Sequence, residues 1–125
     1  MKVIAPAAPL PTVLPGIQHV TRASAGDGLS TLSVWHQTLE AGAATPPHRH
    51  DCDEVVMCMS GSGEVRSGQD TLHFHAGCTL ALPADGEHQI VNSGGTPMEI
   101  IGVFAATPVV TRDLRGAELA LPWQS

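Results

Sequence analysis

The sequence predicts an all-β fold of the sandwich or barrel class, and two observations support this prediction. The chain of 125 residues is rich in turn formers, with 13 glycines and 10 prolines, and only 14% of its residues are charged. Short apolar or alternating runs follow one another, separated by glycine-containing clusters at intervals that suit antiparallel hairpins. Many short strands with frequent glycine and proline are typical of sandwiches and barrels.

The first half of the predicted fold follows a proline-rich segment. Residues 1–16 carry Pro6, Pro9, Pro11 and Pro15 and are expected to form an extended N-terminal arm. Each of the next four runs is apolar or alternates apolar with polar side chains, which predicts strands at residues 17–22, 31–40, 45–50 and 54–59. Turn-forming clusters at residues 26–28 and 41–43 separate the first three.

In the second half of the predicted fold, shorter strand-like runs are again separated by turn-forming clusters. Strands are expected at residues 63–66, 71–75, 79–82, 88–92 and 98–105. Residues 112–119 can form one or two helical turns, and Trp123 is expected to tuck its indole against the domain. A chain of this length forms one domain, so we predict an arm at 1–16, a single barrel domain at 17–110 and a C-terminal tail at 111–125.

Charge and composition narrow the partners that the protein is expected to have. Six lysines and arginines against twelve aspartates and glutamates give a formal net charge of -6, with no basic run, so nucleic acid is not an expected partner. No apolar stretch approaches the roughly 18 residues that cross a bilayer, and the prolines near the N-terminus argue against an export signal. The three cysteines form no CxxC pair, which favours reduced thiols and a cytoplasmic location.

Three histidines and one glutamate make up the candidate metal site. His48 and His50 are two residues apart on a predicted strand, so their side chains project from the same face. Glu54 has the same parity but would lie about 13 Å beyond His48 in a straight strand, so residues 51–53 must bend the chain to bring it back. His88 begins the 88–92 strand after a turn, and it offers a fourth ligand if hairpins bring the two segments together.

Two spaced motifs around these residues resemble those of the cupin superfamily. The first runs from Gly42 through five residues to His48-x-His50, three residues to Glu54 and six residues to Gly61. The second is a set of residues at matching separations, Gly77, Pro83, His88 and Asn92. The family usually has one residue between this proline and its glycine, whereas Ala84 and Asp85 here precede Gly86. The turn therefore departs from the pattern, while His88 keeps its distance from Pro83.

The resemblance implies a small RmlC-like jelly-roll barrel, also called a double-stranded β-helix, that is commonly a homodimer. It also implies one divalent transition metal per chain, held by His48, His50, Glu54 and His88. Three imidazoles and one carboxylate suit Fe(II), Mn(II), Ni(II), Cu(II) or Zn(II), with iron expected first. In this interpretation the histidines are neutral donors, and Glu54 also has a catalytic role as a ligand that can detach to act as a base.

Several other residues are candidates for lining the pocket or supporting the ligands. His36 shares a face with Leu32 and Val34, and either faces the barrel interior or packs in the core. Cys52 lies in the predicted bend, where a thiolate could join the metal or be oxidised, or where a small side chain simply packs. His73 and His75 share one strand face without a nearby carboxylate and are surface or pocket residues. Apolar alternation predicts that the cavity is lined by Val34, Val56, Cys58, Leu80, Leu82, Ile90 and Ile100.

Three functions are compatible with a metal in an apolar barrel. The first is an oxygenase or dioxygenase that acts on a small enol, diketone or catechol-like substrate whose oxygens chelate the ion. The second is a redox-neutral isomerase, cyclase, decarboxylase or lyase, in which the ion is a Lewis acid. The third is a non-catalytic module that binds or senses a small molecule, because one fold hosts many activities.

Overall fold

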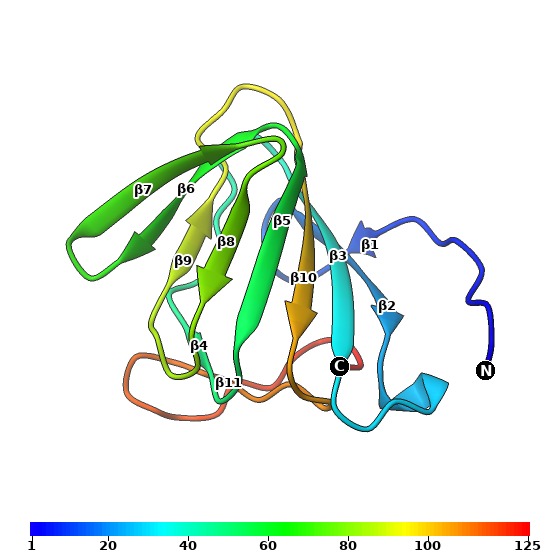
Figure 1. Ribbon diagram of the computed structural model, residues 1–125. Helices are drawn as coiled ribbons and strands as arrows, with labels where there is room; N and C mark the ends of the chain where they lie inside the picture. The colour runs from blue at the N-terminus through cyan, green and yellow to red at the C-terminus, as the bar shows by residue number, and fades with distance from the viewer.

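The computed structural model describes residues 1–125 and consists almost entirely of antiparallel strands in two facing layers (Figure 1). The strands are β1 (Leu10–Pro11), β2 (Ile17–Ala23), β3 (Ser33–Leu39), β4 (Arg49–His50), β5 (Glu54–Ser60), β6 (Ser62–Ser67), β7 (Asp70–His75), β8 (Thr79–Leu82), β9 (Gln89–Val91), β10 (Met98–Phe104) and β11 (Thr111–Arg112). A single 3-10 turn, η1 (Ala25–Asp27), joins β2 to β3. The all-β jelly roll expected from the sequence is confirmed.

The larger layer is a six-stranded sheet in the order β1-β2-β3-β10-β5-β8. The other layer contains the β7-β6-β9 sheet and the short β11-β4 pair. Two isolated bridges, Ala44 with Val91 and His48 with His88, join the segment before β4 to β9. These bridges make the second layer nearly continuous, and they place the segment carrying His48 beside the segment carrying His88.

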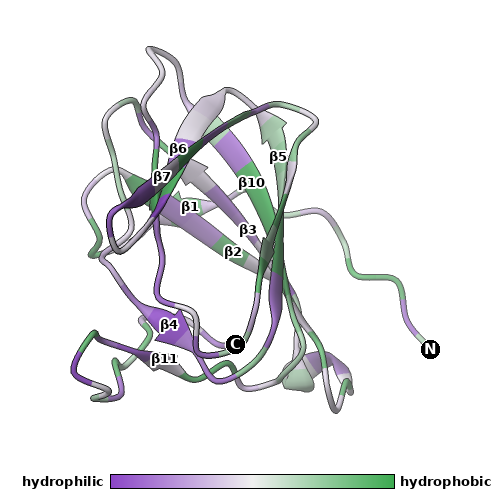
Figure 2. Cartoon of the chain, turned by 60° about the vertical axis from the view of Figure 1, so that its left-hand side comes forward, coloured by the Kyte–Doolittle hydropathy of each residue, from purple (hydrophilic) through white to green (hydrophobic).

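The core lies between the two layers because each strand alternates its side chains between the interior and the outer face. Along β3 and β10 every second residue is buried. The main core cluster combines residues of both layers: Ile17, Leu39, Val56, Cys58, Met98 and Ile100 from the six-stranded sheet, and Val65, Phe74 and Ile90 from the smaller one. In Figure 2 the hydrophobic colour marks β5 and β10, which are neighbours in the larger sheet.

The expected strands differ from the observed ones mainly where proline intervenes. Residues 45–50 were expected to form one strand, but only Arg49–His50 is regular, because Pro46 and Pro47 have no N–H to donate to a ladder. The helical turn expected at residues 112–119 is wrong. That segment instead reverses direction, with hydrogen bonds from Asp113 N to Ala117 O and from Leu119 N to Thr111 O. Gly116 supplies the required positive φ of 88° in this turn.

The two ends of the chain lie differently against the barrel. Residues 1–8 are exposed and run outside the sheets in both views (Figures 1 and 2), and Lys2 Nζ lies 2.7 Å from Asp27 Oδ1 of η1. Within the expected arm, however, Leu10 and Pro11 pair with β2. The C-terminal residues return to the barrel, where Ser125 bonds to Thr107 and to the backbone of Val109. The structure contains no helix long and apolar enough to span a bilayer.

Candidate metal centre and its cavity

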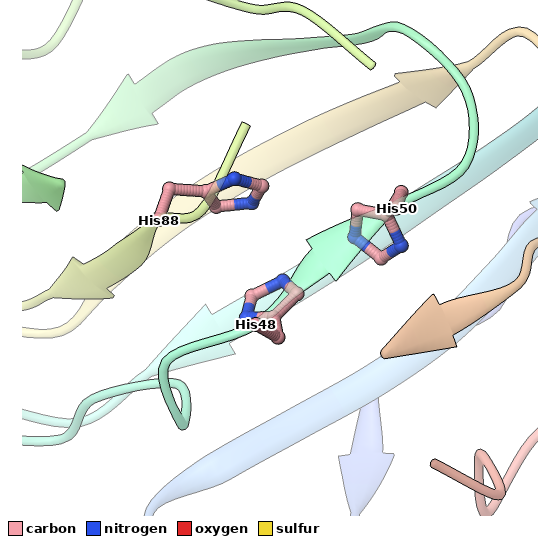
Figure 3. Close-up of side chains that lie close together, drawn as sticks. All are labelled: His48, His50 and His88. Carbon is pink, nitrogen blue, oxygen red and sulfur yellow. The ribbon is translucent and has the colours of Figure 1, made fainter. Parts of the chain in front are cut away.

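Three buried imidazoles converge inside the barrel. His48 precedes β4, His50 lies on β4 and His88 precedes β9, and one ring nitrogen from each lies within 4.8 Å of the other two (Figure 3). The backbone bridge causes this convergence, because His48 N donates to His88 O at 3.0 Å and His88 N donates to His48 O at 2.8 Å. The three histidines form a site that can hold a metal ion.

The Glu54 carboxylate reaches the same place from the opposite layer. Its Oε2 atom lies 3.2 Å from His88 Nε2 and 3.5 Å from His50 Nε2. The predicted bend is present, since β4 ends at His50, residues 51–53 are irregular, and β5 begins at Glu54 in the other sheet. Without the bend, Glu54 would continue along a straight strand and lie too far from His48 to share a metal ion with it.

Backbone carbonyls orient all three rings. The Nδ1 atoms of His48, His50 and His88 lie 2.6, 3.2 and 3.0 Å from the carbonyl oxygens of Pro46, Val110 and Gly86. A carbonyl oxygen only accepts, so each Nδ1 carries a proton and donates it. In the neutral ring this leaves the lone pair on Nε2, which is the arrangement that metal-ligating histidines usually show.

Burial keeps two of these histidines neutral. Burial, followed by the nearby imidazoles, lowers the pKa of His48 to about 4 and the pKa of His50 to about 3. For His88 burial also acts to lower the pKa, but the neighbouring Glu54 carboxylate outweighs it, and the pKa is raised. At neutral pH, His48 and His50 therefore have no proton to lose from Nε2 before they bind a cation.

The departure from the second motif is accommodated by Asp85. This residue adopts a positive φ of 64°, the left-handed conformation that a glycine would take without strain. Aspartate is one of the few other residues that tolerate it. The turn is further held by Asp85 N, which donates to His50 O at 2.8 Å. As a result His88 stays in register with His48 although the motif glycine is displaced.

A cavity of about 280 Å³ is lined by three of the four side chains, His48, His50 and Glu54. Its polar lining consists of Gln37, Thr45, His48, His50, Glu54 and Thr111. The remaining walls are mainly apolar and include Trp35, Val56, Ile90, Ile100 and Phe104. No lysine or arginine faces the cavity, so it offers no side-chain cation to a phosphate group.

The C-terminal tail closes one side of this cavity. Residues 119–123 line it, and the Trp123 ring stacks on His19 with ring centroids 3.9 Å apart and an angle of 13°. The same indole lies edge-on to Trp35, with the centroids 5.3 Å apart. Trp123 thus packs its indole as the sequence suggested, and it forms part of the binding cavity.

Other candidate residues lie away from the metal centre. His36 was a candidate for the interior but occupies the outer face of β3, where its ring lies 2.6 Å from Arg22 Nη2 and 3.3 Å from Glu99 Oε1. Cys52 packs against the small Trp35, Phe104 and Val109 cluster, and burial raises its pKa, which disfavours the thiolate.

Two further candidates are also outside the cavity. Cys58 is part of the main core, with Sγ 3.5 Å from Ser60 O, and His75 is exposed beside the equally exposed His73. Among the apolar residues expected to line the cavity, Val56, Ile90 and Ile100 do so. Val34 instead faces outward from β3, and Leu80 and Leu82 pack beside the core.

Trp35 and Gln37 line the cavity, although local sequence patterns did not indicate them. Both faces of β3 carry apolar side chains, with Val34 on one and Trp35 and Leu39 on the other, so alternation alone did not show which face is inside. The available signal was that Trp35 and Leu39, both large and apolar, lie on the same face as Gln37. The pairing of β3 with β10 decides the orientation.

Comparison with known proteins agrees with this geometry. A family model described as a cupin domain matches residues 35–104. The chain belongs to the cupin family. Auxin-binding protein 1 from Arabidopsis thaliana is 30% identical over 105 residues, which cover 76% of this chain and 53% of the relative. This cupin therefore spans about half the length of the curated relatives that it matches.

Solved structures with the same fold include enzymes. A sugar phosphate isomerase of the cupin superfamily from Silicibacter pomeroyi is 29% identical, with a TM-score of 0.66 over 85% of this chain and 77% of the other. The polyketide cyclase RemF from Streptomyces resistomycificus has a TM-score of 0.68 over 88% and 75% of the two chains. At 18% identity, the likeness to RemF shows the fold alone.

The residues present fit a divalent transition ion. Glu54 Oε2 and His88 Nε2 are both buried and 3.2 Å apart, yet neither makes a hydrogen bond. Buried polar atoms without a partner are costly, and a shared cation satisfies both. Two ligand atoms at about 2.1 Å from one ion and at right angles to each other are about 3.0 Å apart, close to the observed separation.

Removal of one imidazole is expected to lower metal content and stability together. The His88→Ala variant should lose most of the bound metal, and its melting temperature should fall, because the ion ties two separate segments of the barrel. Metal analysis of protein purified without chelator, with thermal unfolding, measures both. His73→Ala is the matched control, since His73 is exposed. Equal metal content in wild type and His88→Ala would contradict the site.

The metal-free protein is expected to lose stability as the pH falls from 7 to 5. His48 and His50 have lowered pKa values in the folded state, so below about pH 6.5 the unfolded chain binds protons that the folded chain does not. The raised pKa of His88 acts in the opposite direction. Urea unfolding at several pH values should show a shallower decline for the His48→Asn/His50→Asn double variant than for wild type or His73→Asn. Equal slopes would refute the assignment.

Proposed function

We propose that this cupin is a metal-dependent oxygenase that acts on a small, largely apolar substrate with two chelating oxygens, of the enol, diketone or catechol type. The observation that carries the proposal is the composition of the cavity. Its titratable lining residues are all candidate metal ligands, and its other walls are mainly apolar. Chemistry in this cavity therefore centres on an ion and not on a separate acid–base pair.

A redox-active divalent ion at this site supplies a Lewis acid and a place where dioxygen can react with the substrate. The protein's own residues hold that ion, with His48, His50 and His88 as neutral nitrogen donors and Glu54 as the one anionic donor. The Glu54 carboxylate offsets part of the ionic charge, and it is the base available to take a proton from an enol or catechol hydroxyl. The apolar walls exclude water from the reacting groups.

The shortage of other titratable groups favours an oxygenase over a redox-neutral enzyme. An isomerase or cyclase takes a proton from one substrate atom and returns a proton to another, and this commonly uses a second acid or base besides Glu54. Here Glu54 is the only carboxylate that lines the cavity. The absence of lysine and arginine from the walls also disfavours a sugar phosphate, the substrate class named for one structural relative.

A binding or sensing module is the second candidate, and two observations favour it. The curated relatives are named auxin-binding proteins, and identity to one of them is 30%. The tail closes the cavity over an aromatic wall of Trp35, Phe104 and Trp123. Such a cavity suits uptake of a small aromatic acid whose carboxylate binds the ion, with no reaction.

Oxygen uptake separates these functions. Iron-loaded protein supplied with 1-phenylbutane-1,3-dione is expected to consume diketone and dioxygen in equal amounts, and to consume neither without air. His50→Ala should reduce the rate at least about 100-fold because a ligand is lost, whereas His73→Ala should keep the wild-type rate. An oxygen electrode and chromatography of the diketone provide the measurements.

Two results would replace the oxygenase with an alternative. Equal consumption of the diketone with and without air would indicate redox-neutral chemistry. A rise in melting temperature on adding the diketone to metal-loaded protein, without any loss of diketone, would indicate a binding module.

We also propose that the active form is a homodimer. Val55, Met57 and Met59 on the outer face of β5 are exposed by 40, 36 and 58%, and the neighbouring residues of β10 on that face are Ile101 and Val103. An apolar sheet face of this kind marks a contact surface, and a second copy offers a matching one. Light scattering should give twice the 13.0 kDa chain mass. Met57→Glu should reduce it to one chain mass, while Leu72→Glu, an exposed site on β7, should not.

A further inference from the structure

Gln37 lines the part of the cavity away from Glu54. In the six-stranded sheet Gln37 pairs with Ile100, whereas Glu54 pairs with Phe104, four residues further along the same strand β10. Four residues correspond to about 13 Å of strand. A ligand that binds the metal by its chelating oxygens and extends along β10 therefore brings its other end toward Gln37.

A chain of hydrogen bonds fixes the orientation of the Gln37 amide. The Thr21 hydroxyl donates its only proton to the carbonyl oxygen of Gln124 in the tail, so toward His19 it can only accept. His19 Nε2 lies 2.8 Å from Thr21 Oγ1 and must therefore carry the ring proton.

These hydrogen bonds also determine which group of the Gln37 amide faces the cavity. His19 Nδ1 is left as an acceptor, and the Gln37 group 3.1 Å from it must be the NH2. Burial lowers the pKa of His19 to about 4, so the ring has a single proton at neutral pH, as this chain of bonds requires. Because the NH2 group of Gln37 faces His19, its carbonyl oxygen faces the cavity.

That oxygen has no partner within the protein. Gln37 is 9% exposed and lines the cavity, and its one side-chain hydrogen bond is the one to His19. Thr45 and Thr111 are polar neighbours in the same lining, but their hydroxyls contact Ile90 N and His50 Nδ1 and make no hydrogen bond to Gln37. An acceptor that lines an apolar cavity and has no partner within the protein favours a ligand that brings a donor to it.

We propose that Gln37 is the specificity-determining residue of the cavity, and that its Oε1 accepts a hydrogen bond from a hydroxyl or N–H at the end of the ligand opposite the chelating oxygens. This inference rests on the proposed function, because it takes the metal as the other anchor. It narrows the substrate class to compact apolar molecules with chelating oxygens at one end and a hydrogen-bond donor at the other. Aromatic diketones with a para-hydroxyl group have this pattern.

Binding of matched diketones tests the role of Gln37. The probes are 1-phenylbutane-1,3-dione and its 4-hydroxyphenyl and 4-methoxyphenyl analogues, with the zinc-loaded protein so that no oxidation takes place. Titration calorimetry should show that wild type binds the hydroxyphenyl compound about fivefold more tightly than the other two, the effect of one net hydrogen bond. Equal affinities for the hydroxyphenyl and phenyl compounds in wild type would overturn the inference.

Two variants separate recognition from general damage. Gln37→Met should bind the hydroxyphenyl and phenyl compounds equally while keeping the wild-type metal content. Thr21→Val should also lose the preference, because His19 is then free to change its tautomer and the Gln37 amide to turn. Thr38→Val is the matched control, since Thr38 lies on the outer face of β3. A preference that survives in Gln37→Met would contradict the assignment.

A measurement without ligand distinguishes failure of this inference from failure of the proposed function. If none of the diketones binds, the substrate class of the proposed function is wrong. The His19 tautomer then decides whether Gln37 presents a hydrogen-bond acceptor to the cavity. Nitrogen-15 spectra of the ligand-free protein should show the His19 proton on Nε2. A proton on Nδ1 would reverse the Gln37 amide and remove its free acceptor from the cavity.

Discussion

The backbone bridge between His48 and His88 is the contact on which the candidate site depends. Its two hydrogen bonds join segments that are far apart in the chain and set three imidazoles on one inner surface. The bend at residues 51–53 then transfers the chain to the opposite layer, so that Glu54 faces those rings across the barrel. The site is thus shared between two sheets, and it exists only when the layers are closed on each other.

The apolar interior gives these side chains their chemical character. Because these side chains are buried, each of their polar atoms needs a partner from the protein, from an ion or from a ligand. The Nδ1 atoms of the three histidines satisfy this need with backbone carbonyls, and burial holds His48 and His50 neutral. Glu54 Oε2 and His88 Nε2 are left without hydrogen bonds at the centre, where a cation fits. In the part of the cavity away from Glu54, the carbonyl oxygen of Gln37 also has no hydrogen-bond partner within the protein, and a ligand can supply one.

Much of the fold was predictable from local patterns, and the errors have identifiable causes. The alternating runs gave eight of the eleven strands at nearly the right bounds, because alternation directly reflects a two-sided sheet. The 45–50 segment was overextended because its alternation outweighed the two prolines that interrupt pairing. The pair β4–β11 was missed because each strand has only two residues, and its second member lay in a segment where a helical turn was expected. Short pairs of this kind are held by neighbouring structure and have little sequence signal of their own.

The sequence by itself determined the fold class and the candidate metal-binding side chains, because turn chemistry, strand alternation and residue spacing are local properties of the chain. It also showed that a bend had to bring Glu54 back, since a straight strand could not. Only the tertiary structure decided which face of β3 is interior, and so placed Gln37 in the cavity and His36 outside it. It likewise decided that residues 119–123 close the cavity. These outcomes depend on pairing between distant strands and on packing of the tail, which no local pattern specifies.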